Sequence, residues 1–404
     1  MLSDSIGGKT IEQALIALAD MTLDAIETQE PEYQARMTNA QAYMRGHNIA
    51  AIYLNAGTNL SYFTGMRWFA SERMVGAVLP AEGGVIYIAP FFEIDTLNDY
   101  MVIPGEIKGW QEHESPYALF CQIIADLTNQ SQAKVGIDES TSFFMVDGIQ
   151  KQQADICLIN ASEVTAHCRM HKSEAEIALI QRAMDMTIQV HQAAASILNE
   201  GISTKEVEAF IHQAHKKVGA VSGSYFCIVL FGKATSFPHG VKEPQILQKN
   251  DIVLIDTGCQ LHGYISDITR TYIYGTATEK QINIWNSEKR AQQTAFEAAL
   301  IGIPCGDVDA AARKSLEKDN LGPDYDLPGL PHRTGHGIGM DIHEWPYLVK
   351  DNPVPLAKGM CFSNEPMIVV PGEFGVRLED HFYMTDTGPA WFTLPSKSIY
   401  EPFA

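Results

Sequence analysis

The chain has 404 residues, a formal net charge of −20 at pH 7 and a hydrophobic content of 46%. This length allows two domains with a large core, and the negative charge argues against nucleic acid or an anionic membrane as a partner. Its seven cysteines are scattered and form no CxxC pair, which predicts reduced thiols in a cytoplasmic protein. We find no secretory signal and no apolar run long enough to span a membrane.

The first half of the chain predicts an α/β domain over residues 1–165. A partial apolar stripe predicts helix over residues 1–47. Short apolar runs then predict strands at 49–54, 74–79, 85–89, 134–137 and 156–160. Helical patterns fall between these strands at 91–100, 115–130 and 141–153.

The second half predicts an α+β domain over residues 172–404. Ser173 and Ser203 are each followed three residues later by Glu, a capping-box pattern that starts two helices. His215 lies off the apolar stripe of the second helix, so we expect it to face solvent. Further strands are expected at 225–231, 252–257 and 265–274, and further helices at 279–300 and 306–319. The last 70 residues are rich in strand and turn patterns.

Asp256 and Asp267 belong to a predicted hairpin that turns near Leu261–His262. With that turn, paired residue numbers sum to 523 and the two carboxylates lie opposite each other. Opposed carboxylates are destabilising without a counterion, and a shared metal ion would resolve the repulsion. The alternative is that both are ordinary acids at strand ends.

The segment HRTGHGIGMDIHEW brings three histidines into a glycine-rich stretch with no helical periodicity. Glycine allows the backbone to approach a bound group closely. We assign His336 to a metal site and His343 to the substrate cleft as a donor. For any one histidine a structural, hydrogen-bonded role is the more common outcome.

Two more acids follow near the C-terminus. Glu365 precedes Pro366, which favours an extended chain at that point. Arg377 and Glu379 are two residues apart, so on a strand they share a face and the arginine can orient the carboxylate. Asp380 then points the other way and is expected to be structural.

The candidate ligands together are four carboxylates and one imidazole: Asp256, Asp267, His336, Glu365 and Glu379. All lie in short apolar segments where unpaired carboxylates are costly. Oxygen ligands with one histidine suit hard or borderline divalent ions. The sequence therefore predicts a two-metal hydrolytic centre.

These residues carry a family resemblance. The order Asp, Asp, His, Glu, Glu, with DTG, GHGIG, NEP and GVRLED segments, resembles the pita-bread metallopeptidases of the Xaa-Pro dipeptidase (prolidase) and Xaa-Pro aminopeptidase type. The resemblance covers about residues 172–404 and implies a pita-bread catalytic domain. The segment NLSYFTGMRW is similar to a creatinase/prolidase-type N-terminal domain, which excludes the single-domain methionine aminopeptidases.

The resemblance also implies how the ligands divide. Asp256 would chelate one metal ion, Asp267 and Glu379 would bridge both, and His336 and Glu365 would hold the second. Two divalent ions are implied, with Mn expected and Co, Zn or Fe as alternatives. A bridging water or hydroxide would be the nucleophile, and Glu365 would be the general base.

The remaining roles concern the substrate. The resemblance implies that His239 and His343 stabilise the oxyanion or the leaving nitrogen, and that His332 is a further cleft histidine. Arg377 is also expected at the substrate site. Trp68, from the first domain, is expected to help close it.

One departure from the family pattern concerns the substrate carboxylate. Prolidases carry an arginine between the histidine ligand and the first glutamate ligand, where this chain has only Lys350 and Lys358. Lysine offers a point charge without the bidentate fork of arginine. We expect Lys350 to take the place of the missing arginine.

The resemblance implies hydrolysis of the Xaa-Pro bond in dipeptides or short peptides by a homodimer. Three alternatives stay open. They are an Xaa-Pro aminopeptidase acting on longer peptides, a hydrolase of a C–N bond in a small osmolyte-like compound, and, more remotely, a non-catalytic binding module on the same fold.

Overall fold

The computed structural model describes residues 6–128 and 133–403. Residues Thr28–Arg169 form one compact unit, here the N-terminal unit. The described residues before Thr28 and after Arg169 form the other, here the C-terminal unit. None of the helices in these ranges is both long and apolar enough to cross a membrane.

The division differs from the expected domain over residues 1–165, because the first segment packs on the C-terminal unit. Helix α1 (Ile11–Ile16) contacts α8 (Glu174–Ser196). The amide of Gly7 donates to the carbonyl of Ala195 at 2.8 Å. Residues 17–29 are not helical, so the helix expected over 1–47 is two separate helices.

The N-terminal unit is built on a six-stranded mixed sheet in the order β4-β3-β2-β1-β5-β6. Its strands are β1 (Ile49–Asn55), β2 (Gly76–Pro80), β3 (Ile86–Pro90), β4 (Glu106–Trp110), β5 (Lys134–Ile137) and β6 (Cys157–Asn160). Its helices are α2 (Glu30–Gly46), α3 (Thr58–Thr64), the short η1 (Phe91–Glu93), α4 (Ile94–Tyr100), α5 (Pro116–Leu127), α6 (Phe143–Gln152) and α7 (Ser162–Arg169). The sequence missed β4, an edge strand whose polar residues give no apolar run.

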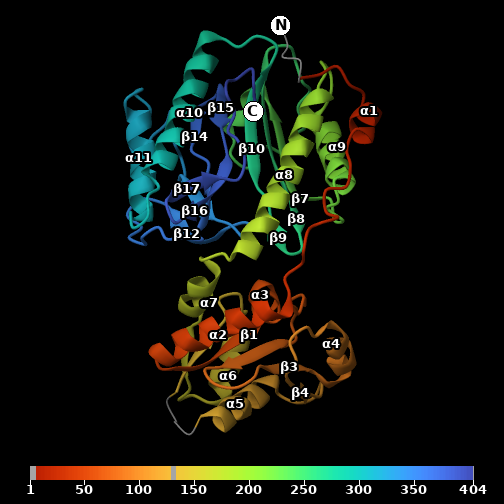
Figure 1. Ribbon diagram of the computed structural model, residues 1–404, viewed down its shortest axis with the longest axis vertical. Coiled ribbons are helices and arrows are strands. Elements are labelled where there is room, and N and C mark those ends of the chain that lie inside the picture. The colour runs from red at the N-terminus through yellow and green to blue at the C-terminus, as the bar shows by residue number, and fades with distance from the viewer. Residues whose placement is uncertain (1–5, 129–132, 404) are drawn as a thin grey trace. The chain divides into compact units, whose positions relative to one another are not determined.

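The first sheet of the C-terminal unit has the order β10-β8-β7, with β9 paired to β8. Its strands are β7 (Ser224–Phe231), β8 (Asp251–Leu261), β9 (Tyr264–Ile265) and β10 (Ile268–Tyr274). Helices α8 and α9 (Thr204–Lys217) pack on this sheet (Figure 1). Both predicted capping boxes are present, at Ser173 and Ser203.

The second sheet of this unit has the order β12-β11-β13-β16-β17, and β14 pairs with β15 beside it. The five strands of the sheet are β11 (Gly335–Gly337), β12 (Glu344–Leu348), β13 (Cys361–Asn364), β16 (Asp380–Thr385) and β17 (Gly388–Trp391). The separate pair is β14 (Met367–Val370) and β15 (Phe374–Arg377). Helices α10 (Glu279–Ala298) and α11 (Cys305–Glu317) lie side by side (Figure 1) and pack against these strands. The two sheets meet where Thr269 bridges Glu379.

The expected pairing of Asp256 with Asp267 was wrong by two residues. Asp256 lies opposite Thr269, so paired numbers sum to 525. The turn is His262–Gly263, and both residues have positive φ, 50° and 95°. Such a turn matches the right-handed twist of a hairpin. The shift by two preserves which residues share a face, so both aspartates still reach the same side.

His215 is buried, contrary to the expectation that it faces solvent. Its Nε2 lies 3.1 Å from Thr187 Oγ1, and its Nδ1 lies 3.0 Å from Ser224 Oγ. A histidine that is hydrogen-bonded at both nitrogens loses little on burial.

Candidate metal centre

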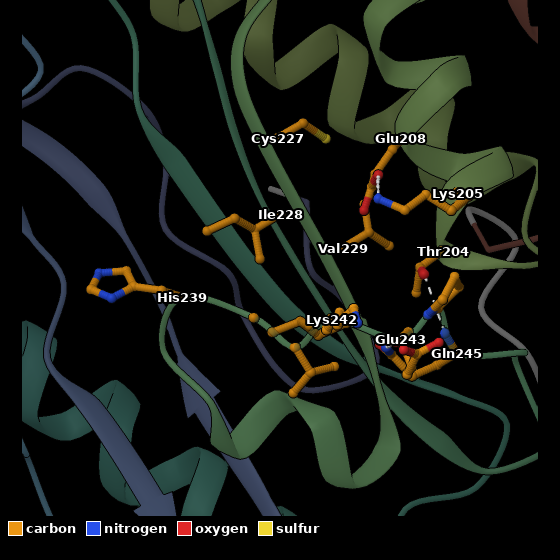
Figure 2. Close-up of a pocket in the computed structure, with 14 residues that line it drawn as sticks. Thr204, Lys205, Glu208, Cys227, Ile228, Val229, His239, Lys242, Glu243 and Gln245 are labelled. Atoms are coloured by element: carbon orange, nitrogen blue, oxygen red, sulfur yellow. Dashed lines mark hydrogen bonds and ion pairs between the residues drawn. The ribbon is translucent and has the colours of Figure 1, made fainter.

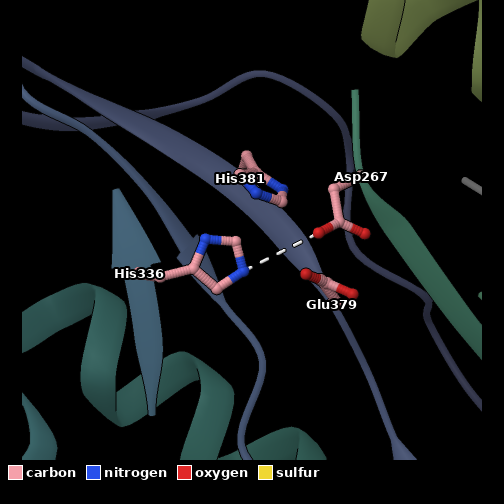
Figure 3. A group of neighbouring side chains, drawn as sticks. All are labelled: Asp267, His336, Glu379 and His381. Atoms are coloured by element: carbon pink, nitrogen blue, oxygen red, sulfur yellow. Dashed lines mark ion pairs between the residues drawn. The ribbon is translucent and has the colours of Figure 1, made fainter. Parts of the chain in front are cut away.

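Four buried side chains meet at the junction of the two sheets. Asp267 follows β9, His336 lies on β11, Glu379 follows β15 and His381 lies on β16. One nitrogen or oxygen from each lies within 4.8 Å of the others. Figure 3 shows the two carboxylates and the two imidazole rings turned toward a common point.

The orientation of His336 is set by its neighbours. Its amide donates to Ser363 Oγ at 2.9 Å. Its Nδ1 donates to the carbonyl of Gly337 at 3.0 Å, and this bond turns Nε2 toward the acids. That Nε2 is 3.1 Å from Glu365 Oε1 and 3.7 Å from Asp267 Oδ2. The histidine therefore presents Nε2 to two of the candidate ligands.

Asp256 and Glu379 are joined through a shared set of donors. Thr269 Oγ1 donates to Glu379 Oε2 at 2.6 Å. Arg377 Nε donates to the same hydroxyl at 3.1 Å, and the guanidinium also donates to Asp256 Oδ2. Arg377 N–H groups further bind the carbonyl of Pro238 at 3.2 Å. Each carboxylate thus has one oxygen fixed by the protein.

The second oxygen of each of these acids has no hydrogen-bond partner among the described residues. Among the described residues, nothing hydrogen-bonds to Asp256 Oδ1, Asp267 Oδ1 or Glu379 Oε1, or to either nitrogen of His381. A buried polar atom without a partner costs about 1–3 kcal/mol. Several such atoms facing one point fit divalent cations bound by oxygen and imidazole donors.

The acids differ in how easily they ionise. Burial, followed by the charges of Glu379 and Asp256, raises the pKa of Asp267 well above its usual range. Burial and Glu365 do the same to the pKa of Glu379. Burial also opposes ionisation of Glu365, but the hydrogen bond and charge of His336 outweigh it and lower the pKa of Glu365. Such repulsion between neighbouring carboxylates is relieved by cations.

Two of the predicted cleft histidines lie beside this cluster. The ring centroid of His343 is 4.3 Å from that of His336. Burial, and then the charge of His336, lowers the pKa of His343 to about 4. Burial likewise lowers the pKa of His332, and Glu365 is close enough to oppose that change. His332 Nδ1 lies 2.7 Å from the carbonyl of Arg333, so Nδ1 carries the proton.

His239 lies in the loop after η2 (Gly232–Ser236) and is exposed. The hydrogen bond from Arg377 to the carbonyl of Pro238 holds this loop, and His239 contributes to the field that lowers the pKa of His343. The residue also borders a small pocket of about 100 Å³ between α9 and β7. In Figure 2 the His239 ring points away from Lys205 and Glu208, which line the far part of that pocket.

Three residues expected to bind substrate contact other protein groups in the structure. Arg377 is buried and its guanidinium is engaged by Asp256, Thr269 and Pro238, so it positions a candidate ligand. The Lys350 ammonium is bound to Asp324 at 2.7 Å. Trp68 lies in the N-terminal unit, with its ring edge-on to Tyr100 at a centroid separation of 6.2 Å. Its role in closing the site stays a prediction.

His381 is the residue that sequence reasoning missed. It follows Glu379 by two positions, the same spacing that placed Arg377 and Glu379 on one face. Burial lowers its pKa well below the usual range, and the charge of His336 acts in the same direction. The imidazole is therefore neutral and able to donate a lone pair.

Comparison with known proteins shows the family to which the chain belongs. The model of metallopeptidase family M24 matches residues 178–386, and that of the creatinase/prolidase N-terminal domain matches residues 36–171. An Xaa-Pro dipeptidase of Lactobacillus delbrueckii subsp. lactis is 30% identical over 364 residues, covering 89% of this chain and 96% of the relative.

Two solved structures are similar over nearly the whole chain. Dipeptidase PepE of Mycobacterium ulcerans has a TM-score of 0.84 at 30% identity, covering 91% of this chain and 97% of the other. A prolidase of Thermococcus sibiricus has a TM-score of 0.81 at 30% identity, covering 90% and 97%. The predicted fold, a creatinase-type domain with a pita-bread catalytic domain, is confirmed.

Proposed function

The chain belongs to metallopeptidase family M24, a family of metal-dependent peptidases, and on that premise we propose that it hydrolyses the Xaa-Pro bond of dipeptides. The observation that carries the proposal is the buried cluster of Asp267, His336, Glu379 and His381, in which carboxylate oxygens and imidazole nitrogens lack partners within the described ranges. A peptide-binding module has no need of such a costly arrangement.

Two divalent cations are proposed at this centre, with Mn as the first choice. Asp267 and Glu379 would contact both ions, Asp256 one of them, and His336 with Glu365 the other. His381 is proposed as an additional donor. When bound, the ions would lower the pKa of a water molecule between them so that it attacks as hydroxide at neutral pH.

Glu365 is proposed to accept the proton of the attacking water. Its lowered pKa keeps the carboxylate ionised. Its side chain is 14% exposed, whereas that of Asp267 is 5% exposed, so Glu365 can exchange a proton with solvent more readily. Ser363 Oγ donates to its Oε1 at 3.1 Å and fixes the carboxylate.

His239 and His343 are proposed to stabilise the oxyanion or the leaving nitrogen. With a pKa of about 4, His343 is neutral at pH 7 and acts by donating an N–H. The bond before proline is a tertiary amide without an N–H of its own. A site that acts through cations, a carboxylate and imidazoles requires no such group from the substrate.

The test is hydrolysis of Ala-Pro beside Ala-Pro-Ala by the Mn-reconstituted protein, with an EDTA-treated control. We expect turnover of Ala-Pro that EDTA abolishes. Equal turnover of the tripeptide would instead indicate an aminopeptidase. EDTA-insensitive turnover, or none on either peptide, would exclude the proposal and direct the search to small C–N compounds.

A further inference from the structure

Arg333 is a basic residue beside the metal centre whose guanidinium has no acidic partner among the described residues. Two other arginines near the centre, Arg377 and Arg313, already form ion pairs. Arg377 is bound to Asp256. Arg313 is bound to Asp309 at 2.7 Å. A half-buried guanidinium that has no acidic partner in the described ranges is available to an anionic ligand.

The two lysines that could supply positive charge to the substrate site also form ion pairs. Lys350 is bound to Asp324 and Lys358 to Asp386, each at 2.7 Å. Both pairs are at the surface, with lysine side chains 48% and 63% exposed. Neither ammonium is held toward the metal centre.

The place of Arg333 is defined by the β11–β12 ladder. Tyr347 lies directly opposite His336 in this antiparallel pair, so their side chains share one face of the sheet. The guanidinium carbon of Arg333 lies 4.3 Å from the centroid of the Tyr347 ring. The ring of Trp345 stands edge-on to Tyr347, at a centroid separation of 5.5 Å. The aromatic platform thus holds the guanidinium on the same face as His336.

The backbone on both sides of Arg333 is anchored. Arg313 Nη2 donates to the carbonyl of His332 at 2.6 Å. The amide and hydroxyl of Thr334 donate to Asp309 Oδ1 at 3.0 and 2.8 Å. Arg333 is also near enough to His332 and His343 for its charge to lower the pKa of each, although burial is the larger cause.

We propose that Arg333 binds the C-terminal carboxylate of the substrate and so makes the enzyme selective for dipeptides. In Xaa-Pro that carboxylate is on the proline itself, next to the bond to be cleaved. A guanidinium can take it as a bidentate pair while its face rests on Tyr347. The identity of the substrate rests on the proposed function, whereas recognition of a prolyl carboxylate by Arg333 can be measured separately.

The experiment compares Ala-Pro with Ala-Pro-amide, which lacks the carboxylate, in the Mn-loaded enzyme. We expect the wild type to favour the free acid. Arg333→Met should lower kcat/KM for Ala-Pro on the order of 100-fold and leave the amide nearly unchanged, because one partner of a desolvated charge pair is removed. Arg333→Lys should retain part of the preference. Turnover of the amide serves as the folding control.

Two further variants separate this role from others. Arg290→Met removes an exposed arginine that pairs with Asp319 and should change neither substrate. Lys350→Met tests the competing assignment. An acid-to-amide ratio that persists in Arg333→Met, an equal loss on both substrates, or a collapse caused by Lys350→Met would overturn the proposal.

Calorimetric titration with L-proline and L-prolinamide gives a readout independent of turnover. The wild type should bind proline more tightly, and Arg333→Met should bind the two alike. If neither peptide is hydrolysed but this Arg333-dependent difference remains, the proposed reaction fails and the carboxylate site stands. If peptides are hydrolysed but proline binding is insensitive to Arg333, the carboxylate site fails alone.

Discussion

Glu379 and Asp380 are consecutive acids with opposite surroundings. Both are buried. Asp380 Oδ1 accepts from Arg270 Nη2 at 2.6 Å and from Thr393 Oγ1 at 2.7 Å, and its Oδ2 accepts from Gln292 at 3.1 Å. Glu379 has Thr269 on one oxygen and, among the described residues, nothing on the other. Both oxygens of Asp380 are therefore hydrogen-bonded, whereas only one oxygen of Glu379 is hydrogen-bonded within the described ranges.

The same contrast holds more widely in the C-terminal unit. Lys172–Glu344 and Arg313–Asp309 are buried pairs at 2.9 and 2.7 Å. The first pair joins segments far apart in the chain, and the second lies within α11. Asp267 and Glu379, beside His336, have no such lysine or arginine partner among the described residues: burial first, and then repulsion from neighbouring acids, raises their pKa values. Buried charge therefore stabilises one region, while in the other it prepares a site for cations.

The largest effect is expected from Glu379→Gln. This change removes a charge from the centre and should abolish metal retention and lower turnover by about 10⁴-fold. Metal content after gel filtration and Ala-Pro hydrolysis measure both. Without metal, the variant should unfold at the same temperature as the wild type or higher, because repulsion is reduced. Normal metal content would contradict the assignment of Glu379.

Asp380→Asn should produce the opposite pattern. Breaking a buried pair leaves Arg270 uncompensated and should cost about 3–5 kcal/mol of unfolding free energy. Urea denaturation measures this loss, and metal content should be retained. Asp319→Asn is the control, because the Arg290–Asp319 pair is partly exposed and should contribute less than about 1 kcal/mol. If Asp380→Asn and Asp319→Asn lose the same unfolding free energy, the buried Arg270–Asp380 pair is no more important for stability than a partly exposed pair.

His381→Leu tests whether His381 belongs to the metal centre or to the packed core around it. If the imidazole donates to a cation, Mn²⁺ affinity should fall by about 10–100-fold. Isothermal titration of the metal-free protein measures this. His191→Leu is the matched control, since His191 is also fully buried but binds the carbonyl of Ile268 at 2.9 Å. If His381→Leu binds Mn²⁺ as tightly as the wild type does, His381 is not a ligand and only packs in the core.

The sequence predicted much of this molecule because its signals are local. The strands β1, β2, β3, β5 and β6 have apolar runs, and α8 and α9 have capping boxes, so each was predicted within a few residues. The acids at the centre were identifiable because each lies in a short, glycine- or proline-marked segment. Spacing by two also indicates a shared face before any partner strand is known.

What the sequence did not predict depends on partners distant in the chain. Residues 6–27 pack on the C-terminal unit through contacts with α8 that no local pattern records. The partners of His215 come from α8 and β7. The β8–β10 register was missed because His262–Gly263 is a less recognisable hairpin turn than Asn-Gly.

Glu288 gives the smallest effect and the most direct test of the comparison. It lies on α10, is 0% exposed, and neither of its carboxylate oxygens has a hydrogen-bond partner in the described ranges. Burial raises its pKa well above the usual range, and the nearby backbone amide of Leu378, followed by the charge of Arg377, only partly opposes this. Unlike the acids at the centre, it is not part of the cluster suited to a metal ion.

Glu288→Met should therefore stabilise the protein by about 1–3 kcal/mol near pH 8, because a buried acid is replaced by an apolar side chain of similar volume. A raised folded-state pKa favours the native state below the unfolded pKa, and this benefit is lost as pH rises through the folded value. The gain in the variant should accordingly grow from about pH 4.5 upward. Urea denaturation at pH 5 and pH 8 measures the difference. A gain independent of pH would mean that packing is the cause, whereas a loss of stability would mean that Glu288 has a partner and belongs with Asp380.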